Sequence, residues 1–138
     1  MSFSKFNNQQ KSLFGVEIKS FINMDHRLVL LAKKINWSVV EAPIEAKLCK
    51  TNGRPALSMR LISGLFLLKN LDNLSDEGLV EKFIENPYYQ HFCGLRDFTH
   101  LLPCNPTSLV KWRKKLGPKY FETLFAESIA VALREKVI

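Results

Sequence analysis

The 138-residue sequence has no long hydrophobic run, and this absence excludes a chain that crosses a membrane as a helix. A membrane-spanning helix needs about 20 consecutive apolar residues, and no stretch here approaches that length. Residues 1–14, MSFSKFNNQQKSLF, contain no continuous apolar segment, so the sequence also predicts no secretory signal. We therefore expect a cytoplasmic protein with no membrane partner.

Cysteine and glycine are scarce as well. The three cysteines, Cys49, Cys93 and Cys104, cannot all pair within one chain, which favours free thiols in a reducing compartment. The six glycines are isolated from one another, whereas a phosphate-binding loop needs several close together. The sequence therefore predicts neither a disulfide scaffold nor a glycine-rich nucleotide-binding loop.

Groups that could bind a metal or catalyse a reaction are few. Four zinc-type ligands lie close together in the sequence, but their spacing, H-x-C-x₆-H-x₃-C, matches no ligand pattern that we can justify. They are His91, Cys93, His100 and Cys104. The 13 acidic side chains are dispersed and form no converging carboxylate set of the kind that two-metal catalysis needs. We predict no metal, no cofactor and no catalytic residue in this chain.

Apolar and basic residues are plentiful. Hydrophobic residues make up 46% of the chain, which is enough for the core of one domain. The net charge is +7, and the basic excess lies at the two ends. Residues 1–53 carry 8 basic and 4 acidic groups, residues 54–105 carry 5 and 6, and residues 106–138 carry 7 and 3. This distribution indicates an anionic partner such as nucleic acid; the alternative is a basic surface that only confers solubility.

The apolar residues recur at helical spacing, and no segment alternates as a strand does. We predict an all-α fold of six or seven helices, in which residues 1–23 form a polar N-terminal arm and residues 24–138 a helical domain. A helix capped by Ser58 is expected to run to about Leu71, and because it is apolar nearly all round we expect it to be the buried central helix. The other expected helices are Asp25–Ile35 capped by Asp25, a short helix after Ser38, one after the cap Ser75, one from Pro87 to Gly94, one from Asn105 or Thr107 to Gly117, and one from Pro118.

The helix before Gly117 has two different faces. At 100° per residue, Leu109, Trp112 and Leu116 share a narrow apolar side. The opposite side is cationic, Arg113 lies at its flank, and small hydroxyl residues begin the helix. The candidate DNA-binding residues here are Thr107, Ser108, Lys111, Arg113, Lys114 and Lys115.

This pattern suits the second helix of a helix-turn-helix-like element. The first residues of such a helix contact base edges in the major groove, and its lysines and arginines neutralise phosphates. The alternative is an ordinary amphipathic surface helix, and the loop 95–106 is longer than a tight helix-turn-helix turn.

Several short motifs follow one another in a specific order along most of the chain. They are Ser12-Leu13-Phe14-Gly15, Gly53-Arg54-Pro55, LISGLFLLKNL, Asn73-Leu74-Ser75-Asp76-Glu77, Glu85-Asn86-Pro87-Tyr88-Tyr89-Gln90, Phe92-Cys93-Gly94, Pro103, Ser108-Leu109, and Trp112-Arg113 to Gly117. Their order and spacing resemble the N-terminal region of bacterial insertion-sequence transposases of the fifth family, over about residues 12–137.

The resemblance implies a role in cut-and-paste DNA transposition. In that family the helical N-terminal region is the presumed binder of the terminal inverted repeats. Strand cleavage and joining belong to a downstream ribonuclease-H-like domain with three catalytic carboxylates and divalent metal. This sequence ends at Ile138, about where that domain would begin, so none of those carboxylates has a counterpart here.

We therefore expect a truncated or split transposase that binds double-stranded DNA at transposon ends and is not itself an enzyme. Arg54 and Arg60, near the start of the central helix, could add phosphate contacts. The alternative is a helical protein-interaction module, in which residues 118–137 pair with a second copy or with a separate catalytic chain.

Overall fold

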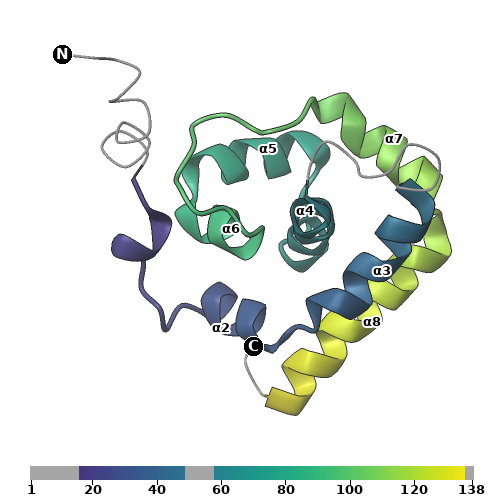
Figure 1. Cartoon of the computed structure of the whole chain (residues 1–138), viewed down its shortest axis with the longest axis horizontal. Coiled ribbons are helices and arrows are strands. Elements are labelled where there is room, and N and C mark those ends of the chain that lie inside the picture. The colour runs from purple at the N-terminus through teal and green to yellow at the C-terminus, as the bar shows by residue number, and fades with distance from the viewer. Residues whose placement is uncertain (1–15, 49–57, 136–138) are drawn as a thin grey trace.

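The computed structural model describes residues 16–48 and 58–135, and within these residues the all-α prediction is confirmed. The described residues form seven α-helices and one short 3₁₀ helix. The helix α4 lies at the centre, where Figure 1 shows it end-on, and the other helices surround it. The elements are η1 (Ile18–Ser20), α2 (Arg27–Lys34), α3 (Trp37–Leu48), α4 (Met59–Leu71), α5 (Asp76–Glu85), α6 (Pro87–Phe92), α7 (Pro106–Leu116) and α8 (Pro118–Glu135).

The central position of α4 follows from its composition. Every residue from Leu61 to Leu68 is buried, because apolar side chains cover the whole circumference of the helix. Gly64 is part of this run and faces α6. A Cβ at Gly64 would lie 2.9 Å from Cys93 Sγ and 3.1 Å from Cys93 Cα, so the lack of a side chain allows the close approach.

Most of the predicted N-caps are confirmed. Ser58 and Ser75 each accept a hydrogen bond from a backbone N–H in the first turn of the helix that follows. Asn86, which is not among the predicted caps, does the same for α6, and Pro87 is the first residue of that helix as predicted. The helix before Gly117 is capped by Asn105, so of the two predicted caps Asn105 is the correct one. Local sequence is sufficient for these assignments because each cap bonds only to residues two or three positions away.

Two predicted caps are wrong. His26, not Asp25, caps α2, because Asp25 lies in a turn in which its N–H donates to Asn23 Oδ1, while His26 Nδ1 accepts from the N–H of Leu28 at 3.1 Å. Ser38 lies inside α3 rather than before it. The reason is that the carbonyl of Asn36 already accepts from the N–H of Val39, so the helix begins at Trp37.

Part of the expected N-terminal arm packs against the domain. Ile18 and Ile22 are buried with Val29 of α2 in a small second cluster. The N–H of Ile18 donates to Arg96 O at 2.9 Å, which fixes η1 beside the loop after α6. Residues 1–15 of the expected arm lie outside the described part of the chain.

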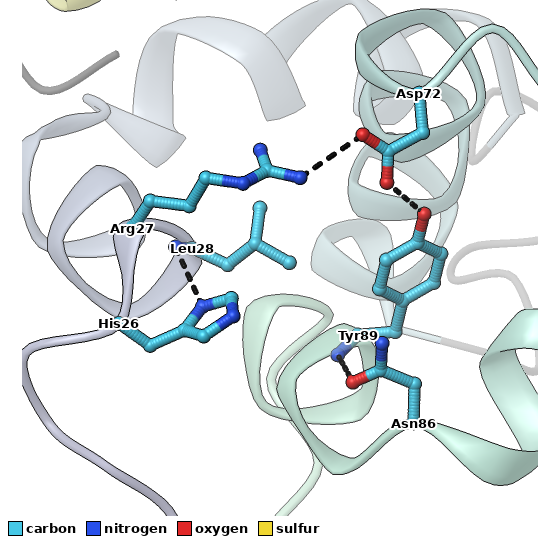
Figure 2. A network of polar contacts seen from close by, with 6 residues as sticks. All are labelled: His26, Arg27, Leu28, Asp72, Asn86 and Tyr89. Atoms are coloured by element: carbon cyan, nitrogen blue, oxygen red, sulfur yellow. Dashed lines mark hydrogen bonds and ion pairs between the residues drawn. The ribbon is translucent and has the colours of Figure 1, made fainter.

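A polar network joins α2, α4 and α6 (Figure 2). Asp72, the C-cap of α4, receives Arg27 Nη2 on one carboxylate oxygen at 3.1 Å and the hydroxyl of Tyr89 on the other. Next to this network, the ring of His26 stacks on Tyr88 with centroids 3.8 Å apart. These contacts tie the first turn of α2 to helices that follow it by more than forty residues in the sequence.

Candidate nucleic-acid interface

The helix α7 is fixed at both ends. At its start, Asn105 Oδ1 accepts from the N–H of Thr107 at 3.0 Å and from the hydroxyl of Thr107 at 2.9 Å. At its end, Lys47 of α3 donates from Nζ to the carbonyl of Leu116 at 2.8 Å. Gly117, with φ of 81°, returns its N–H to Arg113 O, a conformation that a residue with a side chain rarely adopts. Hydrogen bonds at both ends therefore stabilise the helix that carries the outer side chains.

The predicted inner face of α7 is confirmed. Leu109 and Leu116 are fully buried, and Trp112 is half-buried against the same core. The helix packs on α3, α5 and α8 and lies at the rim of the molecule (Figure 1). The helical phase read from the sequence is therefore correct.

The outer face of α7 is cationic. Lys111, Lys114 and Lys115 are exposed, and Lys119 at the start of α8 is exposed beside them in the sequence. Within the part of the chain that the structure describes, none of these four lysines forms an ion pair with a carboxylate. Thr107 is exposed and Ser108 half-buried at the other end of the helix. Five of the six predicted residues on this helix thus face outward or partly outward without an acidic partner.

Arg113, the sixth, is turned toward the fold. Its Nη2 donates to Asp76 Oδ1 at 2.6 Å, and its guanidinium carbon lies 5.9 Å from the centre of the Phe66 ring. The sequence places Arg113 correctly at the flank of the helix but carries no signal for this partner, which precedes it by 37 residues.

Two further arginines, Arg54 and Arg60, are predicted to contact phosphate near the start of the central helix. Arg54 lies outside the described residues. Arg60 is half-buried at the start of α4, where its guanidinium lies 4.4 Å from the centre of the Trp37 ring and Nε donates to Phe92 O at 3.2 Å. Burial lowers the pKa of Arg60 from its ordinary value, although the nearby Cys93 and Glu41 act in the opposite direction.

Of a second group of basic residues, sequence reasoning singled out Arg60 as a phosphate contact and missed the others. Lys19 of η1, Arg60 of α4, His91 of α6 and Arg96 of the following loop line one cleft of about 410 Å³. Four separate segments contribute these residues, so neither helical periodicity nor a charge run indicates them. Only their shared approach to the C-terminal end of α6 brings them together.

The four zinc-type ligands do not form a site. Cys93 is buried against Gly64, Cys104 is half-buried, and His100 is exposed with its ring 5.0 Å from that of Phe98. No three His, Cys, Asp or Glu side chains among residues 16–48 and 58–135 are grouped so that they could hold a metal ion. Nor is any helix in the described ranges long and apolar enough to span a bilayer.

Comparison with known proteins gives one family and one curated relative. The family described as "Transposase domain (DUF772)" matches residues 16–115, which include η1 and all of the helices α2 to α6 and most of α7. An uncharacterized protein, ORF8 in the nfe locus of Rhizobium meliloti, is 37% identical over 131 residues. The match covers 95% of this chain but spans only 63% of that relative's length. No solved structure matches the chain.

Proposed function

The chain belongs to the transposase-domain family DUF772, and from this premise we propose that it serves DNA transposition by binding duplex DNA at the terminal inverted repeats of a mobile element. The observation that carries the proposal is the outer face of α7. Three exposed lysines without acidic partners in the described structure project from a helix that is capped at both ends and anchored by Leu109 and Leu116.

Each part of α7 has a different role in this proposal. Lys111, Lys114 and Lys115 neutralise backbone phosphates, which supplies affinity for any duplex. Thr107 and Ser108 lie in the first turn, and in the proposal they contact base edges in the major groove. The hydroxyl of Thr107 is engaged with Asn105, so we assign the larger share of base contact to Ser108. Arg113 is left out of the contacts because Asp76 holds it.

We propose that strand cleavage is not performed by residues of this chain. The carboxylates of the described residues are dispersed over different helices, and the relative from Rhizobium meliloti has further sequence beyond what this chain matches. In the proposal, the catalytic groups lie in sequence outside these 138 residues, in the same polypeptide or in a separate chain, and the protein acts in the cytoplasm.

A salt titration tests the proposal. Fluorescence anisotropy would compare a duplex carrying the element's terminal inverted repeat with a scrambled duplex of the same length. Neutralising three phosphates predicts that log K falls with log salt at a slope of about −2.7 or steeper. The inverted repeat is expected to bind more tightly than the scrambled duplex. The absence of binding at low salt, or an affinity independent of salt, would contradict the proposal.

The second candidate, a protein-interaction module, is favoured by one feature of α8. Ile129 is 54% exposed on this helix although it is a large apolar residue. Pairing of α8 with a second copy would cover Ile129. Sedimentation equilibrium of the chain and of Ile129→Lys tests self-pairing through α8. A dimer that the lysine dissociates supports it, and a monomer in both contradicts pairing with a second copy.

A further inference from the structure

A cleft lies where η1 and the loop after α6 meet the start of α4. Its lining contains three permanently cationic side chains, Lys19, Arg60 and Arg96, together with the imidazole of His91. Among the described residues that line it, Glu17 is the one acidic side chain, and it is already paired with Arg96 Nε at 3.4 Å. The lining therefore has more positive than negative charge before any partner arrives.

The backbone fixes the segments that carry Lys19 and Arg96, and Arg60 is held by contacts of its own side chain. The N–H of Ile18 bonds to Arg96 O, which fixes Lys19 and Arg96 on facing segments. Arg60 is held by its Nε bond to Phe92 O and by the Trp37 ring. Among the described residues, no acceptor takes a hydrogen bond from the two terminal nitrogens of Arg60.

The floor of the cleft is equally constrained. Gly94 adopts φ of 87°, and a Cβ there would lie 3.0 Å from Cδ of Arg60. The bare backbone at Gly94 therefore lets the arginine stem lie flat across the end of α6. Arg60 and His91 both line the cleft.

We propose that this cleft binds one phosphate group, and that this phosphate belongs to the backbone of the DNA that the chain binds. The identification of the phosphate as part of DNA rests on the proposed function. The binding site itself is inferred from the residues that line the cleft. In Figure 1, η1 and α6 lie on the other side of α4 from α7, so this contact is separate from the lysine face of α7.

His91 reports occupancy of the site. Burial lowers its pKa, and the positive charges of Arg60, Lys19 and Lys33 lower it further. Lys33 belongs to α2, so cations from three elements face the imidazole, while Glu17 and Arg96 complete the lining. A phosphate in the cleft would favour the imidazolium form, and its affinity would rise as the pH falls through the pKa of His91.

The test uses the full chain and inorganic phosphate. NMR titration of the His91 ring would be performed in phosphate and in chloride at equal ionic strength, with His91→Gln to assign the resonance. Phosphate is expected to raise the pKa of His91 by about half a unit or more. The double variant Lys19→Ala/Arg96→Ala, which removes two exposed side chains, should abolish that shift. The matched control Lys111→Ala/Lys114→Ala removes the same charge from α7 and should keep it.

DNA binding by the same variants identifies the source of the phosphate. Lys19→Ala/Arg96→Ala should make the salt slope shallower by about 0.9, the contribution of one neutralised phosphate. An unchanged pKa of His91 in phosphate would overturn the site. A phosphate-dependent shift with an unchanged DNA salt slope would overturn its assignment to DNA. If the chain binds no DNA at all while His91 still responds, the proposed function fails and the phosphate site stands alone.

Discussion

Arg113 of α7 and Asp76 in the first turn of α5 are joined by a bond of 2.6 Å between Nη2 and Oδ1. Asp76 also lies 3.9 Å from Lys69 Nζ, and its carboxylate is favourably placed at the positive end of the α5 dipole. One carboxylate thus links α4, α5 and α7. This relationship separates the basic residues of α7 into one that stabilises the fold and three that face solvent.

For Arg113→Ala we expect a small loss of stability and no change in the salt dependence of DNA binding. Both side chains of the pair are about one-third exposed, so their coupling in a double-mutant cycle with Asp76→Asn should be about 1 kcal/mol or less. Urea denaturation of the wild type, both single variants and the double variant measures it. A salt slope reduced as much as in Lys114→Ala would show that Arg113 leaves Asp76 to contact DNA.

For Lys111→Ala, Lys114→Ala and Lys115→Ala we expect almost unchanged melting temperatures, because exposed substitutions usually alter stability by less than about 0.5 kcal/mol. Each variant should instead make the DNA salt slope shallower by about one and weaken all sequences alike. Lys82→Ala, which removes an equally exposed lysine from α5, is the control and should bind as the wild type does. If the control weakens binding by the same amount, net charge rather than the α7 face governs affinity.

Trp112→Ala should destabilise the protein by about 2–3 kcal/mol. A fully buried tryptophan is worth about 3–5 kcal/mol on truncation, but Trp112 is only half-buried against the core. Thermal denaturation followed by circular dichroism provides the measurement. If Trp112→Ala melts like the wild type while the lysine variants unfold, the phase of α7 would be wrong.

Stability should fall in acid because of Asp72. Burial opposes ionisation of this carboxyl, but hydrogen bonds from Tyr89 and Arg27 and the charges of Arg27 and Lys82 outweigh it, so the pKa lies below the ordinary 3.8. The unfolded chain therefore binds the proton more readily than the folded one. The contribution is complete above the ordinary value and is lost as the pH falls through the lowered pKa.

Urea unfolding over a pH series checks this expectation. Asp72→Asn should make the acid limb of the stability curve shallower than that of the wild type. Tyr89→Phe removes one of the two hydrogen bonds and should give an intermediate slope. Identical acid limbs in the wild type and in Asp72→Asn would contradict the assignment.

Gly64→Ala should destabilise the junction of α4 and α6 by about 1–3 kcal/mol, since the added methyl would be 2.9 Å from Cys93 Sγ. The double variant Gly64→Ala/Cys93→Ala should recover only part of the loss, because Cys93 Cα is also within 3.1 Å. Calorimetry of both variants provides the comparison, and complete recovery would show that the sulfur alone limits the approach.

Features that depend on near neighbours could be predicted from the amino-acid sequence. The caps Ser58 and Ser75 bond to N–H groups three residues away, and the apolar stripe of Leu109, Trp112 and Leu116 follows from the period of the helix. For the same reason the exposed lysines of α7 were predictable. The all-α class and the buried α4 also follow from local composition.

Which distant side chains meet depends on how the helices pack, and the local sequence does not indicate it. Helix packing brings Arg113 into contact with Asp76. It also brings Tyr89 and Arg27 to the carboxylate of Asp72. Lys19 and His91 line the same cleft for the same reason. The N-cap of α2 is likewise His26 and not Asp25. The backbone there is fixed by the turn in which the N–H of Asp25 donates to Asn23 and by the stacking of the His26 ring on Tyr88. Such pairings arise when packed helices bring together side chains that are dozens of residues apart in the sequence. The spacing of residue types along the chain reports only on near neighbours, so it does not predict these contacts.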